Sequence, residues 1–187
     1  YLLGKEQDLA GIRRELAAQI EKVMATGLKP GHIDGHQHCH SYPCLIGVVI
    51  ELADEYGLDA IRSCLPADPS DAEIPAELVD DLALLRNLGQ TARMLIKASG
   101  IRTPDGLWGL PQLHSLDTAG LCILLENLPE GDWELMTHPG HPYRQGRPFE
   151  GEQRLTEMRA LCSAAAKDII GRREIRLGTF GDLPCAS

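Results

Sequence analysis

The chain has 187 residues, of which 43% are hydrophobic and 24% are charged, as in an ordinary soluble domain. Its net charge of −9 and the lack of an extended Lys or Arg run make nucleic acid a poor candidate partner. No stretch approaches the roughly 20 apolar residues of a membrane-spanning helix, so no membrane partner is expected.

The first third of the chain predicts two amphipathic helices around a short strand. Apolar residues recur at helical spacing over residues 7–26, and again over residues 45–56. Between them, residues 32–34 are typical of a short buried strand. Pro43 suits the first position of the second helix, and Gly57 suits its end.

The rest of the chain alternates in the same way. Asp117 is a natural N-cap for one of these helices, and Gly89 is a candidate interruption of another. The expected elements are a strand at 59–62, a polar loop at 66–75, a helix at 76–98, a loop at 103–114, a helix at 117–128, a strand at 133–137, a helix at 153–170 and a strand at 175–180.

This alternation of helices and short strands predicts an α/β fold of parallel strands with crossover helices, a layer or a barrel. In such folds catalytic groups gather where the parallel strands end. Both histidine-rich segments of the sequence follow an expected strand, one after Ile33 and one after Met136. The two segments are therefore candidates for one functional site.

The six cysteines are scattered and form no Cys-x-x-Cys pair. This favours six free thiols and a reducing, cytoplasmic location over a disulfide framework. Cys122 and Cys162 lie within apolar helical patterns, so we expect them to be buried thiols.

The first histidine-rich segment reads His32-Ile33-Asp34-Gly35-His36-Gln37-His38-Cys39-His40. Its histidines and its aspartate occupy alternate positions, so an extended segment would present all five side chains on one face. Imidazole and carboxylate groups bind divalent metals and carry protons near neutral pH. The segment therefore predicts a metal-binding or acid–base site. The second segment, Thr137-His138-Pro139-Gly140, adds another histidine.

These two segments resemble those of the YdjC-like carbohydrate deacetylases, a family that includes chito-oligosaccharide deacetylases. Weaker matches occur at residues 60–62, 108–110 and 176–183, in the same order along the chain. The resemblance implies a (β/α) barrel-like hydrolase that removes acetyl groups from N-acetylated sugars or oligosaccharides. It also implies a divalent metal, magnesium first and zinc as the alternative.

The resemblance also implies roles for particular residues. His36 matches a metal ligand, and His138 and Asp34 are the candidate catalytic groups. Asp34 could instead orient the metal ligand or stabilise the turn locally, and His138 could instead belong to a capped turn at Pro139. Arg62 could bind sugar hydroxyls or form an ion pair, and Trp108 could stack on a sugar ring or pack internally. The histidines expected to orient the ligand, or to stabilise the turn locally, are His32, His38 and His40.

Two elements of the family pattern, an Asp-Asp-Phe-Gly segment and an earlier histidine at a strand end, have no match here. Residues 1–187 are thus expected to form a single YdjC-like domain that is incomplete at its N-terminus and lacks its first strands. Two alternatives stay open: another metal-dependent hydrolase, such as an amidohydrolase or phosphoesterase, and a non-catalytic metal- or sugar-binding remnant. The sequence leaves the oligomeric state open, a homo-oligomer included.

Overall fold

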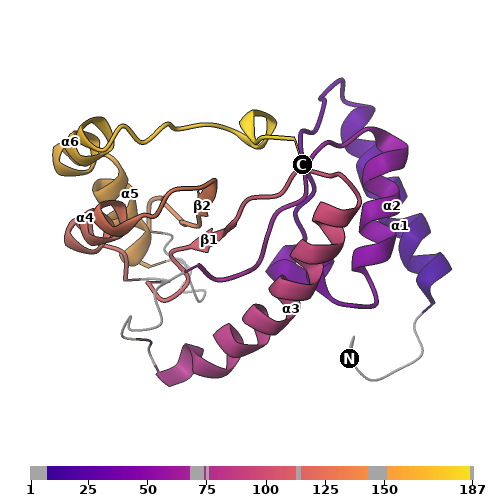
Figure 1. Cartoon of the computed structure of the whole chain (residues 1–187), viewed down its shortest axis with the longest axis horizontal. Helices are drawn as coiled ribbons and strands as arrows, with labels where there is room; N and C mark the ends of the chain where they lie inside the picture. Colours follow the sequence, from indigo (N-terminus) through magenta and orange to yellow (C-terminus); the bar gives the residue numbers. More distant parts are fainter. Residues whose placement is uncertain (1–7, 68–73, 75, 113–114, 143–150, 186–187) are drawn as a thin grey trace. The chain divides into compact units, whose positions relative to one another are not determined.

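The computed structural model describes residues 8–67, 74, 76–112, 115–142 and 151–185 (Figure 1). The elements in chain order are α1 (Leu9–Met24), the 3-10 helix η1 (His36–Ser41), α2 (Ile46–Tyr56), the 3-10 helix η2 (Ala76–Leu78), α3 (Val79–Ala98), β1 (Gly106–Trp108), α4 (Thr118–Asn127), β2 (Trp133–Leu135), α5 (Gln153–Leu161), α6 (Ala164–Arg172) and the 3-10 helix η3 (Phe180–Asp182).

The chain divides into two compact units. The first unit comprises residues 1–66, 80–106 and 178–187, and the second unit comprises residues 67–79 and 107–177. The first unit is thus built from three separate pieces of sequence, between which the pieces of the second unit are inserted. Each unit has its own hydrophobic core.

Three extended segments of the first unit run parallel to one another. Ile33 pairs with Ile61, and Ala60 pairs with Arg102, each in a parallel bridge. The Ile33 N–H donates to the Ala60 carbonyl over 3.0 Å, and the Ile61 N–H donates to the Arg102 carbonyl over 2.9 Å. The strands expected at 32–34 and 59–62 are therefore present as parallel partners, each reduced to an isolated bridge.

Helices α1, α2 and α3 cover the apolar residues of these segments. Helix α1 packs on α2 (Figure 1), and its N-terminus is capped by Asp8, whose carboxylate accepts the Gly11 N–H over 2.8 Å. Helix α2 ends at Gly57, which adopts a left-handed φ of 63° as its position predicts. The buried core residues of this unit include the cluster Ile46, Val49, Ala53, Leu58, Ile61, Ala92 and Ile96.

The sequence predicted Pro43 at the first position of α2, but the helix begins at Ile46, so this prediction was wrong. The Leu45 and Ile46 N–H groups both donate to the Tyr42 carbonyl, over 2.8 and 2.9 Å. Pro43 therefore lies in a turn that precedes the helix, a position for which its fixed φ is equally suited.

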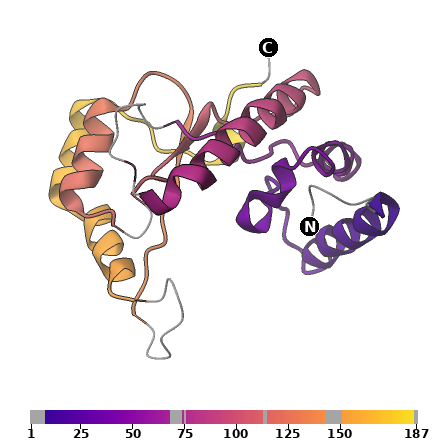
Figure 2. The same ribbon diagram turned by 90° about the horizontal axis from the view of Figure 1, so that it is seen from below.

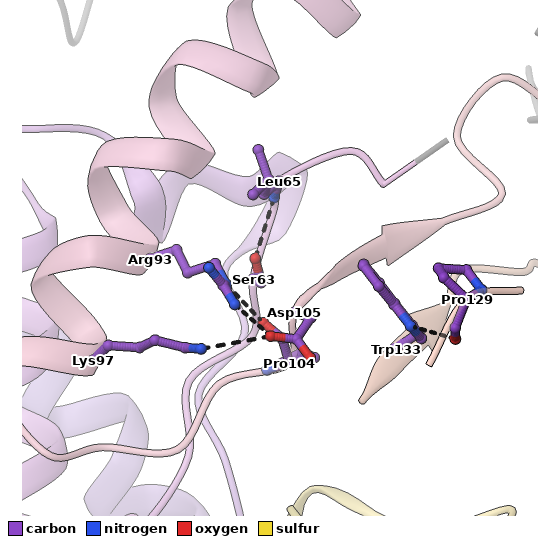
Figure 3. Close-up of polar contacts among 8 residues, drawn as sticks. All are labelled: Ser63, Leu65, Arg93, Lys97, Pro104, Asp105, Pro129 and Trp133. Atoms are coloured by element: carbon purple, nitrogen blue, oxygen red, sulfur yellow. Dashed lines mark hydrogen bonds and ion pairs between the residues drawn. The ribbon is translucent and has the colours of Figure 1, made fainter. Parts of the chain in front are cut away.

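Polar contacts tie α3 to the segment that leads into β1 (Figure 3). Arg93 and Lys97 of α3 both contact the Asp105 carboxylate, and the Arg93 Nε donates to the Pro104 carbonyl over 3.4 Å. Figure 3 also shows the Trp133 indole N–H donating to the Pro129 carbonyl over 3.1 Å. The first set of contacts belongs to the first unit, and the second contact belongs to the second unit.

The second unit contains a small parallel sheet of β1 and β2, covered by α4, α5 and α6. Helix α4 packs against both α5 and α6, as Figures 1 and 2 show. Asp117 caps α4, as expected, by accepting the Gly120 N–H over 2.8 Å. The buried core residues of this unit include the cluster Trp108, Leu116, Leu121, Leu124, Ala160 and Ala166.

Three expectations about secondary structure were wrong. Strand β1 lies where a loop was expected. The expected helix at 153–170 is broken, because the Ser163 hydroxyl accepts the Ala166 N–H over 3.2 Å and so caps a new helix, α6. The expected strand at 175–180 is absent from the described residues, where only η3 begins at Phe180. The strands described form small parallel pairings, and no closed barrel is present among them.

All six cysteines lie in the described part of the chain, and none of them forms a disulfide there, as expected. Cys64 is buried and Cys122 is half-buried, but Cys162 is exposed. The expectation of burial at Cys162 was wrong, because α5 ends there rather than continuing. None of the described helices combines the length and hydropathy that crossing a membrane requires. Most of the loop expected at 66–75, and His114, lie outside the described residues.

Candidate functional site

The histidine-rich segment turns sharply instead of remaining extended. Gln37 and His38 adopt left-handed φ values of 50° and 58° inside η1. The expectation that five alternate side chains share one face was therefore wrong beyond Gly35. His36 lies exposed at the start of the turn, whereas His40 at its end is buried.

His40 joins the ends of two parallel segments. Its ring is 2% exposed; Nδ1 accepts the Gly35 N–H over 2.9 Å, and Nε2 lies 3.0 Å from the Arg62 carbonyl. Because Nδ1 accepts a hydrogen bond, the proton of the neutral ring belongs on Nε2, which donates to Arg62. Burial lowers the pKa of His40, which favours this neutral form. A structural role for His40, one of the two alternatives, is the one this geometry supports.

Gly35 permits this close contact. A Cβ at position 35 would lie 2.9 Å from both the backbone nitrogen and Nδ1 of His40. Any larger residue would push η1 away from the strand end. The glycine between Asp34 and His36 is thus required by the close packing of His40 against the backbone.

Asp34 and Arg62 form an ion pair at the same strand ends. The Arg62 Nη1 lies 2.7 Å from the Asp34 Oδ2, and the other carboxylate oxygen lies 3.8 Å from His40 Nδ1. Asp34 remains more than one-third exposed, so it is both held and accessible. Of the two roles considered for Arg62, the ion pair is present.

His38 is the least satisfied polar group of the segment. Its Nδ1 is buried, and no hydrogen-bond partner for it is present among the described residues. Burial, followed by the charges of Arg62 and His40, lowers the pKa of His38 to about 4. The ring is therefore neutral at pH 7 and carries an unused ligand or hydrogen-bonding atom.

His32 is fixed by a residue from the distant end of the sequence. Its ring stacks on Phe180, with centroids 3.9 Å apart and planes within 10° of parallel. Arg102 Nη1 donates to the Gly181 carbonyl over 2.9 Å, which holds the same segment. Sequence analysis missed Phe180 as a neighbour of the histidines, although the weak family match at residues 176–183 pointed to this segment.

The second unit carries the other two predicted residues. His138 follows β2 and is exposed, and its backbone N–H donates to Glu157 Oε2 over 2.5 Å. Trp108 is 3% exposed and packs edge-to-face on Trp133, with ring centroids 6.1 Å apart. A ring buried in this way offers no face to a sugar, so the packing alternative replaces the substrate role for Trp108.

The donors for a metal have suitable chemistry, but they do not form a complete site in the part of the chain that the structure describes. His36 and Asp34 are accessible imidazole and carboxylate groups, and His38 Nδ1 is unused. However, no group of three or more His, Cys, Asp or Glu side chains among the described residues could hold a metal ion. A divalent metal therefore remains a proposal for this chain.

The fold and these groups define an α/β protein that carries histidines and carboxylates where short parallel strands end, as α/β enzymes commonly do. The chain belongs to the family described as YdjC-like protein, because the model of that family matches residues 1–172. The resemblance inferred from the two histidine-rich segments is thereby confirmed.

Several curated relatives carry names that describe an activity. A carbohydrate deacetylase of Brevibacillus brevis is 28% identical over 179 residues, which cover 92% of this chain and 61% of the relative. A chitooligosaccharide deacetylase of Escherichia fergusonii is 29% identical over 182 residues, covering 94% of this chain and 62% of the relative. The chain thus spans about three-fifths of the length of these two relatives.

A solved structure shares the fold. A crystal structure from Enterococcus faecalis, described as a candidate cellobiose-phosphate cleavage protein, matches with a TM-score of 0.62 and 27% sequence identity. The match covers 92% of this chain and 60% of that one.

Proposed function

We propose that this chain carries part of the active site of a metal-dependent carbohydrate deacetylase that acts on N-acetylated sugars or oligosaccharides. The observation that supports this most strongly is the family match over residues 1–172, which includes both histidine-rich segments. The names of these relatives all refer to carbohydrates: two deacetylases and a cellobiose-phosphate cleavage protein. We therefore favour a sugar substrate.

Deacetylation is amide hydrolysis, which needs an activated water, stabilisation of the oxyanion and a proton for the leaving amine. In the proposed mechanism the exposed imidazole of His138 stabilises the oxyanion or donates this proton. Asp34 accepts a proton or a hydrogen bond from water, with its carboxylate held by Arg62 over 2.7 Å. When bound, a divalent metal would polarise the acetyl carbonyl.

In this proposal His36 contributes one protein ligand for the metal, with magnesium as the first candidate and zinc as the second. Its exposure and its position two residues after Asp34 in the sequence support this role. Neutral His38, with its unused Nδ1, supports a nearby orienting contact.

The test is metal-dependent release of acetate from N-acetylglucosamine oligomers. It should compare the 187-residue chain with the longest natural polypeptide that contains this sequence, each with added Mg²⁺, with Zn²⁺ and with a chelator. We expect release from the longer polypeptide, and slower release from the shorter chain by at least roughly 10²–10⁴-fold, because a hydrolytic site needs more ligands than the described residues provide.

Three results would change this proposal. The variant His36→Ala should bind less metal per chain by elemental analysis, whereas exchange of the exposed His141 for Ala should not; equal metal content in both would remove His36 from the ligand set. If neither polypeptide released acetate from any acetylated sugar, a different metal-dependent hydrolase would be favoured. Sugar binding without turnover would favour a binding module.

A further inference from the structure

Helix α5 holds the backbone of His138 from both sides. The His138 N–H donates to the Glu157 carboxylate over 2.5 Å, and the Arg154 Nε donates to the His138 carbonyl over 3.3 Å. The Gly140 N–H in turn donates to the Arg154 backbone carbonyl over 3.1 Å. The turn that carries His138 is therefore attached to one helix by three hydrogen bonds.

The spacing along α5 explains how two side chains reach the same residue. Arg154 and Glu157 are three positions apart, so they lie on the same face of the helix. Ala160, three positions further, is buried in the core of the second unit and fixes that face inward. The apolar contacts of Ala160 thus orient the helix, and this orientation places the Arg154 and Glu157 side chains next to the backbone of His138.

Glu157 is unusual because its side chain is only 2% exposed. Burial of a carboxylate is costly unless the group is hydrogen-bonded, and a charge-assisted bond to a backbone N–H is among the stronger kinds. The carboxylate accepts the His138 N–H, whereas the Arg154 guanidinium donates to the His138 carbonyl. An apolar residue would fill this core position at lower cost, so packing alone does not explain Glu157.

The turn itself is shaped to fit Arg154. A Cβ at Gly140 would lie 3.0 Å from Arg154 Nε and 3.1 Å from Nη2. The absence of a side chain at position 140 thus leaves room for the guanidinium group to reach the His138 carbonyl. Pro139, with its fixed φ, limits the remaining freedom between them.

We propose that Glu157 and Arg154 are positioning residues that set the direction of the His138 side chain. The N–H of His138 belongs to one peptide plane and its carbonyl to the next, so holding both fixes the Cα–Cβ bond. The Cα–Cβ bond of an exposed histidine is thereby oriented by Arg154 and by the buried Glu157 of α5. This inference rests on the proposed role of His138 in acetyl removal, since positioning matters only if that imidazole reacts.

The first test needs no activity. In the ¹⁵N-labelled 187-residue chain, the His138 amide proton should resonate downfield and exchange slowly, because it donates to a carboxylate. Exchange of Glu157 for Leu should shift the resonance upfield and speed exchange at least roughly tenfold, whereas Glu157→Gln, which retains an acceptor oxygen, should preserve both. Unchanged shift and exchange in the Leu variant, with helix content intact by circular dichroism, would overturn the proposal.

If the Leu variant does not fold, Arg154→Ala decides the question. Arg154 is only partly buried, so its removal leaves the core intact. This variant should leave the Glu157 contact with the His138 N–H unchanged but should remove the hydrogen bond to the His138 carbonyl. The ¹³C chemical shift of the His138 carbonyl reports that loss. An unchanged carbonyl shift would contradict the positioning role of Arg154.

The second test measures acetate release from N-acetylglucosamine oligomers by the longest natural polypeptide. Glu157→Leu should lower kcat at least roughly tenfold with little change in KM, and Glu157→Gln should restore most of the rate, since small misplacements of a catalytic group are costly. Exposed Glu152 at the start of α5 provides the matched control, as Glu152→Gln. Absence of acetate release in every variant and in the parent would refute the proposed function while leaving the amide measurement to judge the positioning.

Discussion

His36, His38 and His40 are the same residue type at equal spacing, yet their surroundings differ in burial and bonding. His36 is exposed, His38 has an unused buried nitrogen, and both ring nitrogens of His40 are hydrogen-bonded. The cause is the left-handed backbone at Gln37 and His38, which turns successive side chains in different directions. The backbone conformation thus gives these histidines different surroundings: His40 stabilises the turn through its hydrogen bonds, and His36 is exposed to solvent.

This division predicts how stability depends on pH. Burial lowers the pKa of His40, and it lowers the pKa of His38 to about 4. The unfolded chain takes up these protons near pH 6.5, so below that pH it binds more protons than the folded chain does. The free energy of unfolding should be highest above about pH 7 and should fall by about 1–2 kcal/mol between pH 7 and pH 5.

Urea unfolding followed by circular dichroism at the two pH values checks this prediction. The variant His38→Asn should lose part of the pH dependence, whereas His141→Asn, at an exposed position of the second unit, should keep it. Parallel pH profiles for the parent and the His38 variant would contradict the assignment to His38.

Among the elements, the helices were predictable where their signals are local. Helix α2 ends at Gly57 and α4 begins after Asp117 because a left-handed glycine and a capping carboxylate act within one turn. The break before α6 also had a local signal in Ser163, but the surrounding apolar pattern concealed it. Strand β1 was missed because a three-residue strand is defined by its partner, here through the Met136 N–H bond to the Trp108 carbonyl over 2.9 Å.

The site shows the same limit. The segments around His36 and His138 are visible in the sequence because their residue types are chemically distinctive. Phe180 against His32 and Glu157 against His138 are contacts between distant parts of the chain. No periodicity or spacing encodes them, so they could only be found in the folded structure.

Helix α3 offers a prediction about close packing. Gly89 was a candidate interruption of this helix, but α3 continues through it, and a Cβ there would lie 2.6 Å from the backbone of Leu65. Exchange of Gly89 for Ala improves helix propensity but forces two backbones apart. The clash should prevail and lower the free energy of unfolding by about 1–3 kcal/mol.

The matched control is Gly47→Ala in α2, where nothing lies within 4 Å of the added Cβ. Helix propensity acts alone at that exposed position, so stability should rise by about 0.5–1 kcal/mol. Both values come from urea unfolding under identical conditions. Stabilisation by the Gly89 exchange would mean that Leu65 and α3 are not in contact.

For the whole molecule, the reactivity of each cysteine thiol should report how exposed that part of the chain is. Cys162 and Cys185 are exposed, whereas Cys64 is buried and burial raises its pKa. We expect a thiol reagent at neutral pH to modify Cys162 and Cys185 first and Cys64 last, because the thiolate is the reactive form. Under denaturing, non-reducing conditions the count should reach six.

Exchange of both Cys162 and Cys185 for Ser should remove the fast phase and leave the slower phases unchanged. Four or fewer reactive thiols in freshly prepared, denatured protein would instead indicate a disulfide. The same measurement also reports whether the two units open separately, since Cys64 belongs to the first unit and Cys122 and Cys162 belong to the second.

The stacking of Phe180 on His32 has a consequence for how the protein is made. A ribosome releases the His32 segment early, and Phe180 follows only after all of α4, α5 and α6 has been synthesised. The histidine-rich strand end, although translated first, therefore acquires its last contact after the inserted unit has emerged. On the growing chain the second unit has all its residues before the first unit does, so nascent folding need not follow the order in which the two begin.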